Sequence, residues 1–124
     1  MGQSSIGVHN QALGRYGERV AVRRLVADGL HLLDRNWRCG LGELDLVMRE
    51  GRVLVAVEVK TRTSTLSGMP HEAVDEVKLA RLRQLAARWQ EERGIRAPEV
   101  RIDLVAVLLA RKGAPTIEHV RGIG

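Results

Sequence analysis

The sequence has no phenylalanine, and its aromatic residues are only Tyr16, Trp37 and Trp89. Sheets that bind single-stranded nucleic acid stack bases on several aromatic side chains, so a platform of that kind is not expected here. Cysteine is scarce as well, because Cys39 is the only one. A lone cysteine excludes an internal disulfide and a zinc site built from several thiolates, which favours a reducing compartment.

Long apolar runs and targeting signals are also missing. Glu58 and Lys60 interrupt the most apolar stretch, which therefore falls short of the roughly 18 residues needed to span a bilayer. Residues 1–10 lack the basic region and the continuous apolar segment of a secretory signal. We therefore expect a soluble, cytoplasmic protein with no membrane partner.

Several familiar catalytic arrangements are absent too. There is no glycine-rich phosphate loop ending in Gly-Lys, and Gly40-Leu41-Gly42 is too short for a dinucleotide site. Cys39 has no histidine in its own segment, so a packing role is expected for it. The histidines are too scattered for a helical zinc motif, and each is expected on the surface or hydrogen-bonded in the core: His9, His31, His71 and His119.

What the chain does have is enough apolar material for one core. It has 124 residues, of which 44% are hydrophobic and 28% charged, so a single domain is expected. Lys and Arg outnumber Asp and Glu by 20 to 15, which gives a net charge of +5. A basic domain fits a polyanionic partner, above all nucleic acid. Most of the positive charge is arginine, which suits phosphate binding but is explained equally well by a GC-rich genome.

Hydrophobic periodicity predicts an α/β domain. We expect a helix over residues 11–28 that ends at Gly29, and a second helix with Pro70 in its first turn that ends at Gly94. Residues 1–10 are predicted to be a flexible tail to a single domain over 11–124. The expected strands are 30–37, 43–49, 52–61, 99–110 and 116–121. The order helix, three strands, helix, strand predicts one mixed sheet flanked by helices.

The first helix carries an acid within an apolar face. Ala21, Val22 and Leu25 stand three, four and seven residues after Glu18, on the same side of the helix. A carboxylate in that position needs a cation or a hydrogen bond to offset its desolvation. The simplest interpretation is a structural pairing with an arginine.

Residues 43–49 and 52–61 are predicted to form a hairpin. If Glu50-Gly51 is the whole turn, three pairs lie opposite each other: Arg49 with Arg52, Asp45 with Ala56, and Glu43 with Glu58. One face of the hairpin then carries Glu43, Asp45, Glu58 and Lys60, and the other carries Leu44, Leu46, Val55, Val57 and Val59. A three-residue loop with a bulge at Gly51 would shift the register by one and separate Asp45 from Glu58.

Two carboxylates held on one sheet face predict a metal site. Asp45 and Glu58 would repel each other, and a hard divalent cation such as Mg²⁺ or Mn²⁺ would keep both ionised. Lys60 lies two residues after Glu58 and could orient or deprotonate a water molecule for attack on a phosphodiester. The alternative is a solvated face on which Glu58, Lys60 and Arg62 pair across strands.

Six segments, in this order, resemble the bacterial YraN family. They are Gly14-Arg-Tyr-Gly17-Glu18, Asn36-Trp-Arg38, Gly42-Glu43-Leu-Asp45-Leu46, Val57-Glu58-Val59-Lys60-Thr-Arg62, Glu72-Ala73-Val74 with Lys78, and Arg101-Ile-Asp103-Leu-Val105. The likeness extends from Leu13 to Val107, nearly the whole chain. It departs from the family at Leu44, where the signature proline would stand, and at Leu66-Ser-Gly68, where the family has Phe-Gly.

The resemblance implies a fold and a chemistry. Members of that family are predicted endonucleases of the restriction-endonuclease-like superfamily, with an αβββαβ core and a PD-(D/E)-x-K signature similar to that of Holliday junction resolvases. It makes Asp45 and Glu58 metal ligands together with the carbonyl of Val59. It also makes Lys60 the catalytic lysine, and it makes Glu18 an acid that completes the active site.

The leading hypothesis is therefore a Mg²⁺- or Mn²⁺-dependent endonuclease that acts on branched or single-stranded DNA in repair or recombination. Expected DNA-facing residues are Arg15, Arg19, Arg38, Arg62 and Lys78. Arg15, Arg19 and Arg23 form a basic stripe that could also be merely solvated, and Lys78 lies in an apolar stripe where it snorkels or meets an anion. Alternatives are a DNA-binding module without catalysis and a structural protein. A homodimer is compatible with the chain.

Overall fold

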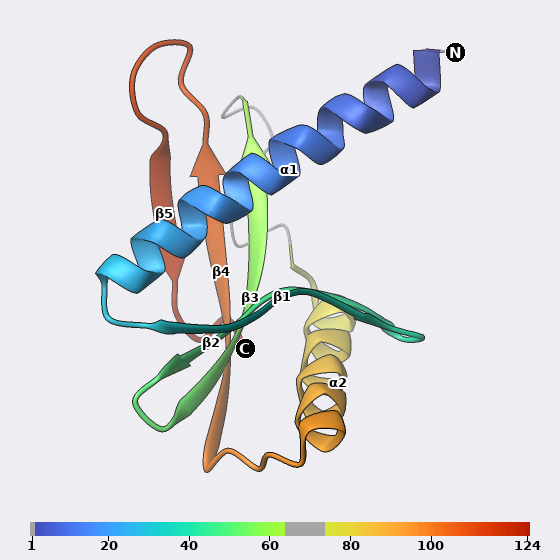
Figure 1. The fold of residues 1–124 in the computed structure, drawn as a ribbon, viewed down its shortest axis with the longest axis vertical. Coiled ribbons are helices and arrows are strands. Elements are labelled where there is room, and N and C mark those ends of the chain that lie inside the picture. Colours follow the sequence, from blue (N-terminus) through green and yellow to red (C-terminus); the bar gives the residue numbers. More distant parts are fainter. Residues whose placement is uncertain (1, 64–73) are drawn as a thin grey trace.

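The computed structural model describes the backbone of residues 2–63 and 74–124, with side chains from residue 11 onward within those ranges. Helix α1 (Gly2–Ala27) precedes three strands, β1 (His31–Cys39), β2 (Gly42–Glu50) and β3 (Val53–Arg62). Helix α2 (Glu76–Arg93) follows, and then strands β4 (Glu99–Leu108) and β5 (Thr116–Val120) (Figure 1). This confirms the α/β class and the αβββαβ order, with β5 added at the end.

The strands form one mixed sheet in the order β1-β2-β3-β4-β5. Strands β3 and β4 are parallel, and α2 lies in the connection between them, whereas the other neighbours are antiparallel. A parallel pair needs a crossover of this kind, because the chain must return to the same end of the sheet. Strand β4 has a neighbour on each side, and β5 lies at an edge, as the sequence predicts.

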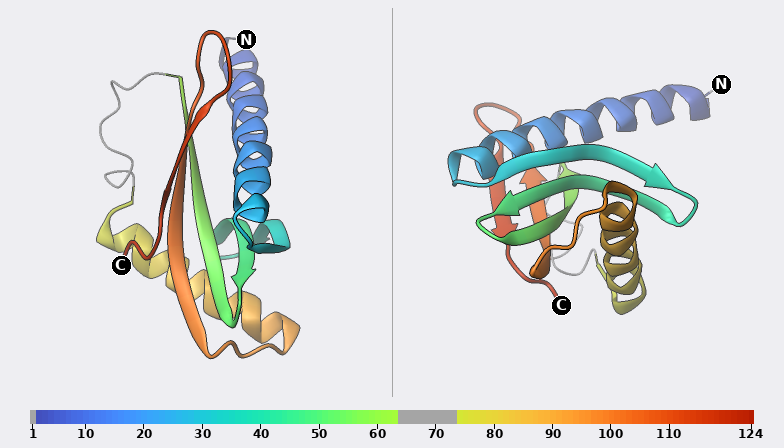
Figure 2. Two further views of the ribbon diagram at one scale, coloured as in Figure 1. Left: turned by 90° about the vertical axis from the view of Figure 1, so that its left-hand side faces the viewer. Right: turned by 60° about the horizontal axis from the view of Figure 1, so that its bottom comes forward.

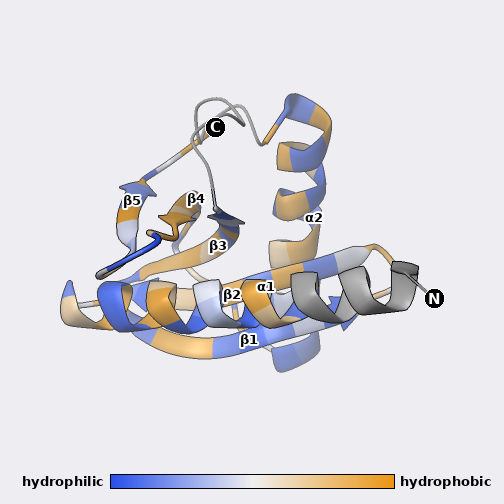
Figure 3. Ribbon diagram, turned by 90° about the horizontal axis from the view of Figure 1, so that it is seen from above, coloured by the Kyte–Doolittle hydropathy of each residue, from blue (hydrophilic) through white to orange (hydrophobic). Residues whose placement is uncertain are grey.

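The two helices lie on opposite faces of the sheet (Figure 2). Each covers its own hydrophobic core, so the strands between them are apolar on both faces, whereas the exposed sides of the helices are largely hydrophilic (Figure 3). The core against α1 includes Ala21, Leu25, Leu46, Met48, Val55, Val57, Val105 and Val107. The core against α2 includes Trp37, Leu44, Val47, Leu54, Ala56, Leu82, Leu85, Trp89 and Ile102.

Both helices end as predicted but begin elsewhere. Gly29 and Gly94 follow the helices with positive φ angles of 101° and 64°, which glycine adopts without strain. Helix α1 begins earlier than predicted, at Gly2, and the predicted flexibility of residues 1–10 stays a prediction. Helix α2 begins later, at Glu76, because the Asp75 carboxylate caps it by accepting a hydrogen bond from the Lys78 amide at 2.8 Å. Pro70 lies outside the described residues.

The predicted hairpin register is wrong by two residues. Glu50 pairs with Val53 and Arg49 with Leu54, so the turn consists of Gly51 and Arg52. Gly51 has a φ of 60° and occupies the first central position of the turn, which glycine fills in type II′ hairpins. A shift of two keeps the predicted faces from Leu46 to Val57 and places Asp45, rather than Glu43, level with Glu58. The prediction is wrong for Leu44, which packs in the core against α2 although Leu46, Val55 and Val57 pack against α1.

Candidate active site

Strands β2 and β3 part at Asp45. The last pair of their ladder is Leu46 with Val57, and beyond it the Asp45 carboxylate takes the place of a backbone acceptor. Its Oδ2 accepts a hydrogen bond from the Val59 amide at 2.9 Å. At the same point, the alternation of side chains along β2 is interrupted: Leu44 packs on the α2 side and Leu46 on the α1 side, although residues two apart in a strand normally share a face. This point where β2 and β3 separate, here called the fork, fixes Asp45 between the two strands and beside Glu58.

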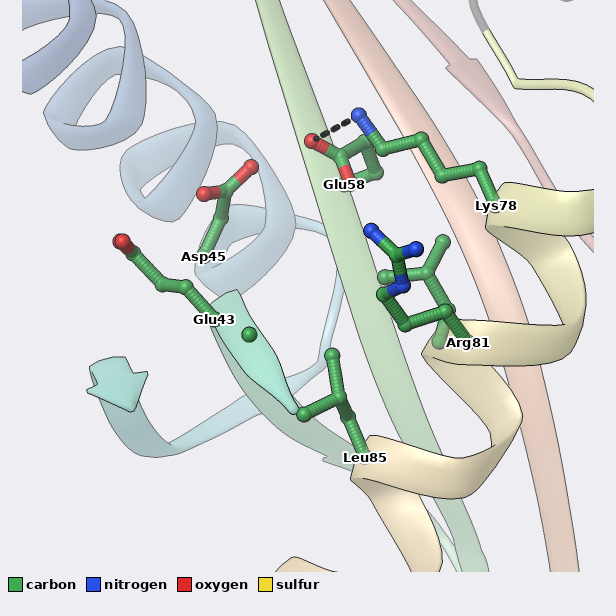
Figure 4. Close-up of a pocket in the computed structure, with 8 residues that line it drawn as sticks. Glu43, Asp45, Glu58, Lys78, Arg81 and Leu85 are labelled. Carbon is green, nitrogen blue, oxygen red and sulfur yellow. Dashed lines mark ion pairs between the residues drawn. The ribbon is translucent and has the colours of Figure 1, made fainter. Parts of the chain in front are cut away.

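Glu58 is buried and faces helix α2. The Lys78 ammonium lies 3.4 Å from Glu58 Oε1, and this ion pair crosses the hollow drawn in Figure 4. Gly42, Glu43 and Asp45 line the other side of this hollow, which has a volume of about 240 Å³. Glu58 therefore meets a carboxylate on one side and an ammonium group on the other.

Two further acids complete the cluster. The carboxylates of Glu18, Glu43 and Asp45 each offer an oxygen, and these oxygens all lie within 4.8 Å of one another. Glu18 comes from α1 and the other two from β2, so elements far apart in the sequence converge here. The Arg38 Nε donates a hydrogen bond to Glu43 Oε2 at 3.0 Å at the exposed margin of the cluster.

Glu18 reaches the cluster because α1 lies unusually close to β3. A Cβ atom at Gly17 would overlap the hydroxyl group of Thr61, so only glycine permits this approach. The Thr61 hydroxyl is buried there without a hydrogen-bond partner in the described part of the chain. Asn36, whose φ of 52° is rare for a residue other than glycine, hydrogen-bonds to Glu18 from β1.

Burial and mutual repulsion of the carboxyl groups dominate the electrostatics of the cluster. Burial, followed by the charge of Glu58, raises the pKa of Asp45 to about 8. Burial also raises the pKa of Glu18; the hydrogen bond from Asn36 opposes this shift, and the charge of Glu43 adds to it. Carboxyl groups in such a setting bind protons or cations readily, because either relieves their repulsion.

Lys60 lies on the same strand as Glu58 and near Lys78. Burial lowers the pKa of Lys60, the charge of Lys78 lowers it further, and the charge of Glu58 acts in the opposite direction. The structure therefore brings Lys60 together with Glu58, as the spacing predicts. The backbone amide of Val59 donates a hydrogen bond to Asp45, and the ligand role of the Val59 carbonyl stays a prediction.

The expected DNA-facing residues fall into two groups. Arg15 and Arg38 line a second hollow of about 500 Å³ with Glu18 and Glu43, so this hollow meets the first one at Glu43. Lys78 lines the first hollow. The other two lie elsewhere in the fold: Arg19 has its guanidinium 5.9 Å from the Tyr16 ring centre, and Arg62 is exposed at the end of β3.

Three residues of the site were not among the predicted ligands or phosphate-binding residues. Glu43 was predicted on the same hairpin face as Asp45, two residues before it, but was not assigned as a ligand. Arg81 lines the hollow one helical turn after Lys78, and that spacing could have indicated it. Asn36 had no usable signal, because its positive φ angle cannot be read from the sequence.

The comparison with known protein families identifies the family of this chain. A family model described as "Uncharacterised protein family UPF0102" matches residues 17–107. The chain belongs to the UPF0102 family. The matched range contains Glu18, Glu43, Asp45, Glu58 and Lys60. The family resemblance indicated by the sequence motifs is confirmed as far as family membership is concerned.

Individual UPF0102 proteins are similar along nearly their whole length. A UPF0102 protein of a Nocardioides species is 54% identical over 124 residues, covering all of both chains. The UPF0102 protein of Beutenbergia cavernae is 62% identical over 113 residues, covering 91% of this chain and 96% of its own. That of Kineococcus radiotolerans is 52% identical over 113 residues, covering 90% and 93%. Among residues 2–63 and 74–124, no helix is long and apolar enough to cross a membrane.

Proposed function

We propose that this UPF0102 chain is a Mg²⁺- or Mn²⁺-dependent DNA endonuclease of the restriction-endonuclease-like PD-(D/E)-x-K superfamily. Its expected substrates are branched or single-stranded DNA in repair or recombination. The observation that carries the proposal is the meeting of Asp45 and Glu58 where β2 and β3 part, with Lys60 two residues further along β3. The overall sheet order and the helix on each face are compatible with that superfamily.

The acidic cluster fits a hard divalent cation. Oxygen ligands lie about 2.1–2.5 Å from such an ion, so two ligands on opposite sides of it are about 4–5 Å apart. The carboxylate oxygens of Glu18, Glu43 and Asp45 lie within 4.8 Å of one another. Burial and the charge of Glu58 raise the pKa of Asp45, and a bound cation would offset both effects. Asp45 would hold the ion, with Glu18 and Glu43 offering oxygens within reach of it. Glu58 and the Val59 carbonyl are the further ligands that the family resemblance implies.

The chemistry divides between the cation and the chain. When bound, a cation of this kind would polarise a phosphate oxygen and make a nearby water molecule more acidic. Burial and the charge of Lys78 lower the pKa of Lys60, which makes its neutral amine easier to form, and that amine would take a proton from the attacking water. In its charged form, the same amine stabilises negative charge on the phosphate in the transition state. Arg15, Arg38 and Arg81 line the adjoining hollows and are placed to bind flanking phosphates.

A nuclease assay tests the proposal. Purified protein is incubated with labelled four-way junction, flap, single-stranded and linear duplex DNA, in Mg²⁺, Mn²⁺ or EDTA. We expect metal-dependent cleavage that Asp45→Asn abolishes and that Lys60→Ala lowers about 10²- to 10⁴-fold with little change in DNA affinity. Asp28→Asn and Lys112→Ala, which change exposed residues outside the site, are the matched controls. Equal cleavage by all of these proteins would identify a contaminant and overturn the proposal.

A DNA-binding module without catalysis is the second candidate. It is favoured by the ion pair of Lys78 with Glu58, which neutralises one of the two central acids without a metal. On this alternative, DNA binds through the basic rims of both hollows, and Asp45→Asn leaves the affinity unchanged or improves it by removing a negative charge. Tight binding of all substrates without cleavage in either metal would establish the module and exclude the nuclease.

A further inference from the structure

The ion pair of Lys78 with Glu58 is a contact in the site that a cation bound to Glu58 would disturb. Lys78 Nζ lies 3.4 Å from Glu58 Oε1, and that carboxylate is also one of the two central acids. An ammonium group and a divalent cation on the same carboxylate repel each other strongly in a partly buried site. Both cannot be bound there at full strength.

Lys78 has no other described anion to hold it in place. Its backbone belongs to the first turn of α2, where the helix dipole disfavours a positive charge. Its side chain is about one-third exposed and borders an open hollow, so the ammonium group can leave Glu58 without unfolding its surroundings. Arg81 lines the same hollow, is exposed and forms no ion pair within the described residues.

We propose that Lys78 is a built-in competitor of the divalent cation, which displaces it from Glu58 and thereby makes it available to a substrate phosphate. Metal binding and DNA binding are then coupled through one side chain, and each strengthens the other. The released ammonium group would bind a phosphate over the hollow beside Arg81. This inference rests on the proposed function, because it needs both a metal and a polyanion at this site.

The metal arm of the test does not depend on activity. Mg²⁺ is titrated calorimetrically into the full chain and into Lys78→Met, Lys78→Gln, Arg81→Met and Asp45→Asn, with circular dichroism to verify folding. We expect both Lys78 variants to bind Mg²⁺ about three- to tenfold more tightly than the wild type, a typical size for such coupling. Arg81→Met should stay within about twofold of the wild type. Asp45→Asn should not bind.

The DNA arm measures the coupling itself. Fluorescence anisotropy gives the affinity for labelled junction DNA without metal and with saturating Ca²⁺, which serves as a probe cation. In the wild type, we expect the cation to strengthen binding about five- to tenfold. In Lys78→Met, that strengthening should shrink to about twofold, whereas Arg81→Met weakens DNA binding in both conditions and keeps the strengthening.

The outcomes separate this inference from the proposed function. Weaker or unchanged Mg²⁺ binding by the Lys78 variants would overturn it, because Lys78 would then orient Glu58 or act independently of it. The metal site would survive that result as long as Asp45→Asn abolishes binding. A wild type that binds no metal would overturn the site and the inference together.

Discussion

Asp45 and Asp103 are aspartates on the same sheet with opposite surroundings. Asp103 is fully buried and accepts hydrogen bonds from Arg101, from His119 and from the Gly122 amide, at 2.7–3.0 Å. Despite its burial, the hydrogen bonds from His119 and Arg101 hold its pKa below the ordinary value. Asp45 is partly buried. The hydrogen bond from the Val59 amide does not offset the effects of burial and of the Glu58 charge on its pKa, which rises to about 8.

The contrast separates an acid whose charge is balanced by the fold from one whose charge is not. The cations around Asp103 extend to Glu50, which pairs with both Arg101 and Arg121 and ties the β2–β3 turn to β4 and to the segment after β5. Every charge in that network has a counterpart among the described residues. The Asp45 cluster keeps an excess of negative charge, which costs stability in the absence of a ligand. A site that binds a cation needs this excess, and a structural network does not.

The largest expected effect is at the satisfied acid. Asp103→Ala should lower the free energy of unfolding by about 3–5 kcal/mol, because it leaves Arg101 and His119 without their buried partner. Urea denaturation measures this loss. Asp103→Asn, which retains the shape, should lose less, about 1–3 kcal/mol. If Asp103→Ala were as stable as the wild type, the network would not be structural.

The opposite sign is expected at the unsatisfied acid. Without metal at pH 8, Asp45→Asn should raise the free energy of unfolding by about 1–3 kcal/mol, because a neutral side chain removes the repulsion and can still accept the Val59 amide. Thermal unfolding in EDTA checks this. Addition of Mg²⁺ should then stabilise the wild type and leave Asp45→Asn unchanged. A destabilised Asp45→Asn would place Asp45 in the same class as Asp103.

The two regions should also respond to pH in opposite directions. The pKa of Asp45 is raised from 3.8 to about 8, so the native state binds the extra proton and metal-free stability falls as the pH rises through this window. The pKa of Asp103 is lowered, so its contribution is present above its ordinary pKa and is lost as the pH falls below it. The slope from one proton is at most about 1.4 kcal/mol per pH unit. Urea denaturation from pH 3 to 9 should show that the fall in stability between the pKa of 3.8 and that of about 8 disappears in Asp45→Asn.

The smallest effect is expected for an exposed acid. Asp28 pairs with Arg24 at 3.3 Å, four residues apart at the end of α1, and both side chains are in solvent. Asp28→Asn should change the free energy of unfolding by less than about 0.5 kcal/mol, because solvent screens such pairs. The same denaturation assay serves as the reference for the two buried acids. If Asp28→Asn lowered the free energy of unfolding as much as Asp103→Ala, burial would not explain the difference between exposed and buried acids.

The sequence predicts the fold through local patterns. Alternating and helical apolar spacing locates the strands and helices, and the glycines at 29 and 94 locate the ends of both helices. The hairpin register was not predictable, because Gly51 fits either central position of a two-residue turn, and only the packing of the strands decides between them. The start of α2 was missed because Asp75 was not considered as its cap.

Part of the site could also be predicted from local sequence patterns. Glu18 was recognisable as an acid on an apolar helix face, and Asp45, Glu58 and Lys60 were recognisable from their strand spacing. Contacts between segments far apart in the sequence could not be predicted in this way. Lys78 meets Glu58 across a crossover, and Arg101 meets Glu50 over 51 residues. Nothing local to Asp103 in the sequence identifies His119, 16 residues later, as its partner.

The central claim is that the acids at the fork of β2 and β3 form a cation site. It is tested most directly by calorimetric titration of Mg²⁺ at pH 8 into the wild type, Asp45→Asn and the control Asp28→Asn. We predict saturable binding to the wild type and to Asp28→Asn, and none to Asp45→Asn. Equal heats for all three proteins, or no binding to any of them, would contradict the claim.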